Sequence, residues 1–252
     1  MMSKVDILVP AYKPPTGWDA KICDAIRSLR RHFAGQEVEL TLHLVNDGSA
    51  LAYYDEEAMK RIQEAAEGRF HFHTYTPNHG KGYALRYGVS QTKGDYLVYT
   101  DTDFPFGWET VALAIEKLRN GADVVMGQRG AEYTESLSPM RRLLSKSVRK
   151  MNRLLLGLPD DLLDAQSGLK GFNAKGREVF LQTTVDTFVF DSEFILMAWN
   201  RNLDIQTVPL HLAPGLKMSR MGLKVMIREG LLFLRVFLKN RLFTRVRRNC
   251  VK

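Results

Sequence analysis

The chain has 252 residues, of which 45% are hydrophobic and 25% charged, a composition typical of one large or two small globular domains. Its two cysteines, Cys23 and Cys250, are far apart, which excludes a disulfide framework or a cysteine metal cluster and favours a reducing compartment. The net charge of +8 is uneven: residues 217–252 hold eleven Lys and Arg and one acid, a net +10 that leaves −2 for the rest.

The first half of the chain alternates apolar strand patterns with helical patterns. We predict strands at 5–10, 38–45, 70–75, 96–100 and 123–126, and helices at 19–29, 55–66, 83–91 and 108–119. Asp19 is predicted to cap the first helix. This alternation predicts an α/β fold with a mostly parallel sheet and helices on both faces. In such sheets, ligands bind beyond the carboxyl ends of the strands.

The second half is less regular. We predict a polar loop at 128–139, a basic helix at 140–156, a strand at 166–173, a helix at 191–200, a strand at 205–210 and a loop at 211–222. The last element, 223–246, reads as a basic amphipathic helix, and no apolar run approaches the ~20 residues of a membrane span. The helix could lie in a membrane interface or pack on the core with its basic face in water. We therefore divide the chain into a domain at 1–222 and a basic helix and tail at 223–252.

Two carboxylates follow the strand at 96–100. Asp101 and Asp103, separated by Thr102, project to the same side of an extended segment and can reach one cation. A simple strand-ending turn is the alternative, because Asp is common in turns. The neighbouring loops favour the cation site.

Two further loops belong to the same predicted edge of the sheet. Asp47, in an Asn-Asp-Gly turn, offers acceptors for the N–H groups of a nucleobase, or else simply forms the turn. Lys81, in a Gly-Lys-Gly segment that opens a helix, suits a phosphate. Together with the paired carboxylates, these loops predict a site for a nucleoside diphosphate and a divalent cation, Mg²⁺ or Mn²⁺.

The segments that carry these residues resemble a known family. ILVPAY, LVNDGS, NHGKGYALRYG and YTDTD resemble the family 2 glycosyltransferases of the GT-A fold. DAQSGLKGF, FDSEFILMA and VPLHLAPGLKMS resemble its dolichyl- or polyprenyl-phosphate sugar synthase branch. The similarity covers roughly residues 5–230.

The resemblance implies roles for individual residues. The nucleotide-sugar, a UDP- or GDP-sugar, would be held by Pro10, Ala11, Tyr12, Asp47, Lys81, Asp101 and Thr102. The metal that bridges its diphosphate would be held by Asp101 and Asp103. The acceptor phosphate and the donor diphosphate would be held by Arg129, Arg141, Ser145 and Lys217. The acidic segment near the acceptor would be Asp191 and Glu193, although favourable charge at a helix start is the alternative for both.

The chain departs from the pattern of this branch at three places. Pro105 replaces a glutamine that would be a further metal ligand. Leu216 replaces the serine before Lys217, and the arginine expected upstream of that loop is absent, with His211 nearby. These departures put the metal shell and the acceptor grip in question.

The predicted function is an inverting, metal-dependent transfer of a sugar from a nucleoside diphosphate to a polyprenyl phosphate. An acceptor phosphate is already ionised and needs no base, whereas a glycan or protein hydroxyl would need one, for which Asp191 is the best candidate. A nucleotidyltransferase and a non-enzymatic module that binds an anionic polymer are rival functions of different classes. We expect a cytoplasmic protein, peripheral on the inner face of the membrane, with no nucleic acid partner; the sequence does not predict an oligomeric state.

Overall fold

The computed structural model describes residues 2–130, 152–187 and 189–211, together with the single residues 142, 147, 149, 150, 232 and 238. Three predicted site residues, Arg141, Ser145 and Lys217, lie outside the described residues. Almost all of the predicted helix and tail at 223–252 lies outside them as well.

Strands and helices alternate through most of the described chain. The strands are β1 Ser3–Ala11, β2 Val38–Asp47, β3 Phe70–Tyr75, β4 Tyr96–Tyr99, β5 Val124–Arg129, β6 Lys170–Phe172 and β7 Ile205–Leu210. The α-helices are α1 Trp18–His32, α2 Glu56–Ala65, α3 Lys81–Gln91, α4 Gly107–Arg119, α7 Ala174–Leu181 and α8 Phe190–Asn200. Short helical turns occupy Leu51–Tyr53, Asn152–Leu156 and Asp160–Leu162.

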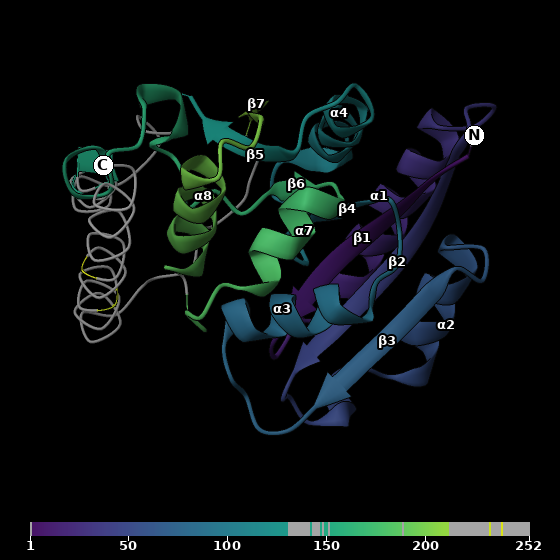
Figure 1. Ribbon diagram of the computed structural model, residues 1–252. Coiled ribbons are helices and arrows are strands. Elements are labelled where there is room, and N and C mark those ends of the chain that lie inside the picture. The colour runs from purple at the N-terminus through teal and green to yellow at the C-terminus, as the bar shows by residue number, and fades with distance from the viewer. Residues whose placement is uncertain are drawn as a thin grey trace.

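The described strands form one sheet in the order β3-β2-β1-β4-β6-β5-β7 (Figure 1). Within it, β6 runs antiparallel to its neighbours β4 and β5, and the remaining neighbouring pairs are parallel. The predicted α/β fold with a mostly parallel sheet is therefore confirmed. The parallel strands end at one edge of the sheet, which carries Asp47 at the end of β2, Asp101 just beyond β4 and Arg129 at the end of β5.

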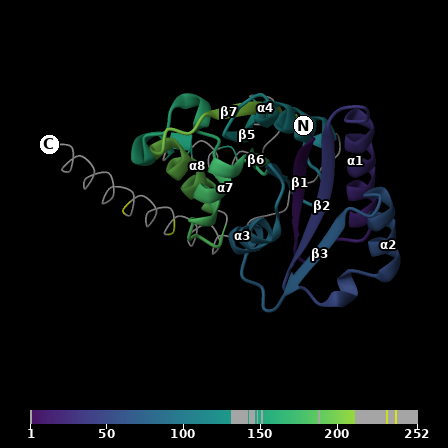
Figure 2. The same cartoon turned by 45° about the vertical axis from the view of Figure 1, so that its right-hand side comes forward.

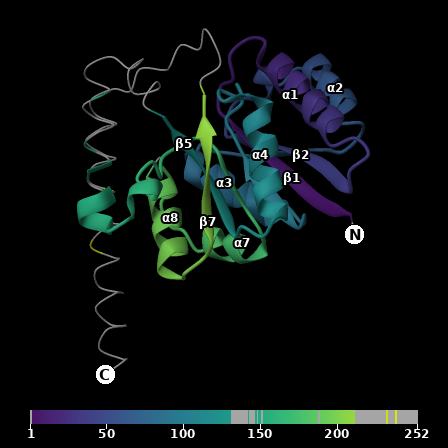
Figure 3. The same ribbon diagram turned by 90° about the horizontal axis from the view of Figure 1, so that it is seen from above.

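Helices cover both faces of the sheet, as Figures 2 and 3 show. Alternate strand residues face opposite sides, so β1 gives Ile7 to one core and Leu8 to the other. The first core lies under α1, α2 and α4, and the second under α3, α7 and α8. The α3 helix packs closely on β1 at Gly88, where a Cβ would lie 2.6 Å from a methyl group of Leu8.

Several predicted boundaries were wrong. Asp19 does not cap α1: the helix begins at Trp18 after Gly17, and the Asp19 carboxylate instead accepts a hydrogen bond of 2.8 Å from Arg61 of α2. Pro10 does not end β1, which continues to pair with β2 as far as Ala11. Proline is tolerated here because β1 pairs with β4 only as far as Leu8, so β4 needs no N–H group from residue 10. The strand predicted at 166–173 is only β6, and α7 was not predicted.

In the part of the chain that the structure describes, no helix combines the length and the apolar character needed to cross a membrane. Two residues of the predicted 223–246 helix are described. Leu232 packs against the core beneath α3, α7 and α8, whereas Leu238 is exposed. These two leucines leave both predictions for the helix open.

Three histidine rings lie against one another on the α3 side of β2 and β3. From their contacts we expect the stability of the fold to fall in acid. The His43 ring lies 3.0 Å from His73 and 3.3 Å from the carboxylate of Asp6, and its ring centroid is 5.0 Å from that of His71. Burial, and then the neighbouring His43 and His71, lower the pKa of His73 from 6.5 to about 4. The fold therefore favours neutral His73, and this stabilisation, complete above pH 6.5, is lost as the pH falls towards 4.

We expect a His73→Gln variant to show this as a changed pH dependence. The stability advantage of the wild type should shrink by about 1–2 kcal/mol between pH 7 and pH 4.5, a value discounted for partial exposure of the ring. Denaturant unfolding across this range measures it, with His211→Gln, at an exposed position, as the matched control. Parallel curves for wild type and His73→Gln would contradict the assignment.

Candidate active site

The turn after β4 brings the paired carboxylates against the start of α3. The ammonium group of Lys81 lies 2.5 Å from Oδ1 of Asp101. On the opposite side, Gly168 passes so close that a Cβ there would lie 2.6 Å from Oδ2 of Asp101. The Asp101 carboxylate is thus held in one position between the ammonium group of Lys81 and the chain at Gly168.

The chemistry of this pair fits a divalent cation. Burial, and then the nearby carboxylate of Asp101, raise the pKa of Asp103. The two ionised carboxylates repel each other, and a bound cation would relieve that repulsion. Burial works against the charge of Lys81, but Asp101, Asp191 and Asp103 outweigh it and raise the pKa of Lys81. Within the described residues there is no group of three or more His, Cys, Asp or Glu side chains able to hold a metal. A cation here would therefore be completed by oxygens of a ligand or water, in line with Pro105 standing where the branch has a glutamine.

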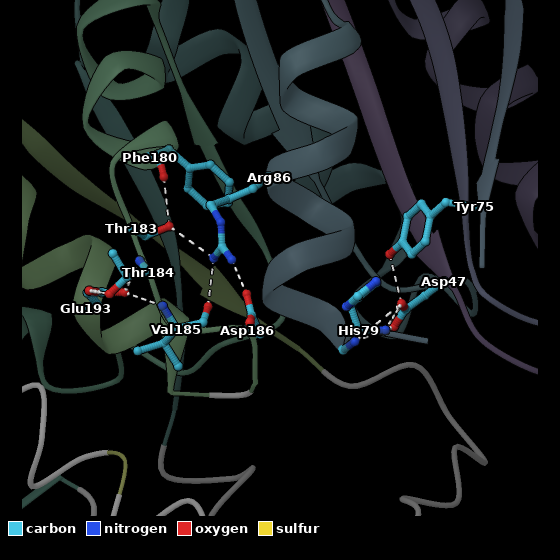
Figure 4. A network of polar contacts seen from close by, with 11 residues as sticks. Asp47, Tyr75, His79, Arg86, Phe180, Thr183, Thr184, Val185, Asp186 and Glu193 are labelled. Carbon is cyan, nitrogen blue, oxygen red and sulfur yellow. Dashed lines mark hydrogen bonds and ion pairs between the residues drawn. The ribbon is translucent and has the colours of Figure 1, made fainter. Parts of the chain in front are cut away.

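Asp47 holds the loop before α3 (Figure 4). The residue is only 4% exposed, and its side chain accepts hydrogen bonds from the Tyr75 hydroxyl (2.8 Å) and from the backbone N–H groups of His79 (3.0 Å) and Gly80 (3.1 Å). Asp47 thus positions the segment that leads into Lys81. Its contact with a nucleobase stays a prediction.

The segment after β1 lies beside the end of β2. The backbone N–H of Lys13 donates to Ser49 (2.8 Å), and the Tyr54 hydroxyl donates to the carbonyl of Ala11 (3.2 Å). Ala11 is buried, whereas Tyr12 is 49% exposed. Of the residues predicted to hold the nucleoside, Tyr12 therefore offers the most free surface.

Arg129 is held by an acid that the sequence patterns did not reveal. Its guanidinium forms an ion pair with the buried carboxylate of Asp164, through Nη2 and Nε, and its backbone N–H donates to the same group (2.7 Å). Arg149 lies 3.8 Å from this carboxylate. Asp164 thus fixes Arg129 at the end of β5, at the predicted edge.

Asp191 is joined to two further residues that were not predicted. Its Oδ1 lies 2.8 Å from the ammonium group of Lys170 and accepts a hydrogen bond of 2.6 Å from the Tyr99 hydroxyl. Burial lowers the pKa of Lys170 and raises that of Tyr99, and Asp191 adds to the second shift. The signal that could have indicated this group is a lysine inside the apolar pattern of GLKGF.

Glu193 has a structural partner. Its carboxylate accepts hydrogen bonds from the backbone N–H groups of Thr184 (2.7 Å) and Val185 (2.9 Å) and from the Thr184 hydroxyl (2.8 Å) (Figure 4). The same segment is tied to α3 by Arg86, which donates to the carbonyl of Val185 (2.7 Å) and pairs with Asp186. These contacts lock the start of α8, with Asp191, to the start of α3, with Lys81.

The fold agrees with the comparisons to known proteins. Residues 6–177 match the sequence model of Glycosyl transferase family 2. The chain therefore belongs to glycosyl transferase family 2. This membership confirms the predicted enzyme class and the predicted family.

Two of the relatives are named as enzymes of dolichyl phosphate or dolichol phosphate. The chain is 24% identical over 233 residues to the dolichyl-phosphate beta-glucosyltransferase of Saccharomyces cerevisiae, covering 85% of this chain and 69% of the relative. It is 30% identical over 95 residues to the dolichol-phosphate mannosyltransferase of Pyrococcus furiosus, covering 37% and 27%. Another match, the hexosyltransferase Agl6 of Haloferax volcanii, is 27% identical over 139 residues, or 54% of this chain, which spans only 33% of that relative.

Solved structures show the same fold. Glucosyl-3-phosphoglycerate synthase of Mycobacterium tuberculosis, in complex with Mn²⁺, UDP and glucosyl-3-phosphoglycerate, superposes with a TM-score of 0.61 at 17% identity. The match covers 94% of this chain and 79% of that one. The same enzyme is also known with Mg²⁺ and UDP. This likeness confirms the predicted GT-A fold.

Proposed function

We propose that this glycosyltransferase transfers a sugar, with inversion and with a divalent metal, from a UDP- or GDP-sugar to a polyprenyl phosphate. The observation that carries the acceptor class is the guanidinium of Arg129, which the buried carboxylate of Asp164 fixes at the end of β5. A guanidinium held in one orientation suits an ionised phosphate better than a neutral hydroxyl. An ionised phosphate also needs no general base.

The donor side of the proposal rests on the turn after β4. Asp101 and Asp103 would hold Mg²⁺ or Mn²⁺ together with oxygens of the donor diphosphate. When bound, the metal supplies positive charge to the leaving diphosphate. Lys81, beside Asp101, adds a second positive charge at the start of α3, where backbone N–H groups also favour an anion. The residues proposed to surround the nucleoside are Tyr12, Ala11, Pro10, Thr102 and Asp47.

The acceptor side rests on Arg129 and Asp191. The Asp164 carboxylate fixes the guanidinium of Arg129, which suits a residue that must meet a phosphate in one orientation. Arg141, Ser145 and Lys217 are proposed to complete the grip on the phosphates. Their placement lies outside the described residues.

The acceptor also suggests where the protein works. A polyprenyl phosphate stays in a membrane, and the net charge of +10 on residues 217–252 would attract anionic lipid headgroups. We propose a peripheral association with the cytoplasmic face of the membrane. The names of the yeast and Pyrococcus relatives support the same acceptor class.

A panel of UDP- and GDP-sugars with Mn²⁺ tests this function. Each donor is incubated with polyprenyl phosphate, with phosphoglyceric acid or without acceptor, and the products are separated by mass. We expect one donor to give a glycolipid only in the first arm, with one nucleoside diphosphate released per glycolipid. A phosphoglyceric acid glycoside without any glycolipid would refute the lipid acceptor.

A further inference from the structure

A lysine lies buried in the centre of the sheet, directly beneath the proposed acceptor side. Lys170 is 0% exposed, although it carries an ammonium group. It is the first residue of β6 and pairs in register with Tyr99 of β4 and with Met126 of β5. Its position is therefore set by the strands on both of its sides.

The contacts of this ammonium group point to one residue. Its nitrogen lies 2.8 Å from Oδ1 of Asp191 and donates to the carbonyl of Ser167 at 2.5 Å. The Tyr99 hydroxyl donates to the same Oδ1, and the ammonium lies 5.9 Å from the centre of the Tyr99 ring. Two donors from neighbouring strands thus converge on one oxygen of Asp191.

A buried lysine is a poor way to stabilise a fold. Removing an ammonium group and a carboxylate from water costs several kcal/mol each, and apolar residues of similar volume often replace a buried ion pair without loss of stability. Burial lowers the pKa of Lys170, which shows that the charged form is penalised here. The fold alone gives no reason for the pair of Lys170 and Asp191 rather than two apolar residues of similar volume.

The charges around Lys170 continue to the metal-binding turn. Asp191 lies close enough to raise the pKa of Lys81, and Lys81 pairs with Asp101. Lysines and acids therefore alternate from Lys170 through Asp191 and Lys81 to Asp101. Each charge in this row has an opposite neighbour, so moving one of them shifts the field at the next.

We propose that Lys170 is a positioning residue for the transfer reaction, which acts by holding the Asp191 carboxylate, together with Tyr99, in one orientation towards the acceptor. This inference rests on the proposed place of Asp191 beside the acceptor. Hydrogen bonds reach Asp191 at Oδ1 alone within the described residues, which leaves Oδ2 for the substrate side. Lys170 itself touches no substrate.

Lys170→Met tests the proposal, because methionine keeps an unbranched chain without the charge. We expect kcat to fall about 10- to 100-fold with the donor KM within twofold, the size of loss that follows a misplaced group. The Tyr99→Phe variant, which removes the second donor, should lose kcat in the same direction. Lys175→Met, at an exposed lysine that pairs with Asp123 just before β5, is the matched control and should stay within twofold of wild type.

A double variant separates positioning from an independent role. If Lys170 acts through Asp191, Lys170→Met combined with Asp191→Asn should be no slower than Asp191→Asn alone, within twofold. Losses that multiply would overturn the proposal, as would a kcat for Lys170→Met within twofold of wild type. If Lys170→Met fails to fold, Tyr99→Phe takes its place: its kcat is compared alone and combined with Asp191→Asn, and the same two outcomes support or overturn the proposal.

The test of Lys170 does not depend on which acceptor the enzyme uses. Rates are compared with wild type on whichever acceptor of the panel supports turnover, or as donor hydrolysis if none does. Failure of the lipid acceptor shows as a missing glycolipid in the wild type. Failure of the positioning role shows instead as multiplying losses or unchanged rates in the variants.

Discussion

Replacing Asp103 with alanine is expected to lower turnover about 100- to 1000-fold, the loss that accompanies removal of one group that stabilises charge in a transition state. Asp101 alone would hold the metal weakly, and the donor diphosphate would lose the positive charge placed against it. The measurement is kcat at saturating donor across a Mn²⁺ titration. Asp95→Ala, at an exposed residue before β4, is the matched control and should stay within twofold of wild type.

Stability distinguishes this loss from unfolding. Since burial and Asp101 raise the pKa of Asp103 in the folded protein, its charge opposes folding near neutral pH. The metal-free Asp103→Ala protein should therefore unfold at the same temperature as wild type or at a higher one. Turnover within threefold of wild type at every Mn²⁺ concentration, limiting concentrations included, would rule out a metal role for Asp103.

Replacing Asp47 with alanine should damage both the fold and the donor site. The change leaves the N–H groups of His79 and Gly80 and the Tyr75 hydroxyl without their acceptor. Each unsatisfied group costs about 1–3 kcal/mol, so we expect a loss of about 3 kcal/mol in the free energy of unfolding. The loop before Lys81 would lose its anchor, and the donor KM should rise at least about tenfold.

Asp55→Ala provides the comparison for Asp47. Asp55 caps α2 by accepting a hydrogen bond of 2.8 Å from the N–H of Ala58, away from the proposed donor contacts. Its loss should cost about 1 kcal/mol and leave the donor KM unchanged. Denaturant unfolding and initial rates on both variants give the two quantities. An Asp47→Ala protein that matches Asp55→Ala in both would show that Asp47 only forms its turn.

Strands could be predicted where a short run of neighbouring residues carries the whole strand pattern. The predictions at 70–75 and 205–210 coincide with β3 and β7. The α7 helix was missed because Gly176 weakens its helical pattern, and the reason for that glycine is not local. A Cβ at Gly176 would lie 2.8 Å from the carbonyl of Asp123, some fifty positions earlier in the chain.

The candidate site divides in the same way. The sequence indicated Asp101, Lys81 and Asp191 through short motifs, each readable within a few residues. Their partners could not be predicted, because Lys170 meets Asp191 only after β6 has inserted between β4 and β5. Asp164, which fixes Arg129 from 35 positions away, is hidden for the same reason.

The acceptor is the central claim, and one ratio tests it most directly. Polyprenyl phosphate and the matching polyprenol differ only in the phosphate, so kcat/KM for the two, measured with one donor and Mn²⁺, isolates the role of that group. Because the alcohol must lose a proton during transfer and the ionised phosphate need not, transfer to the alcohol should be at least about 100-fold less efficient than transfer to the phosphate. Equal efficiency, or a preference for the alcohol, would contradict a phosphate acceptor.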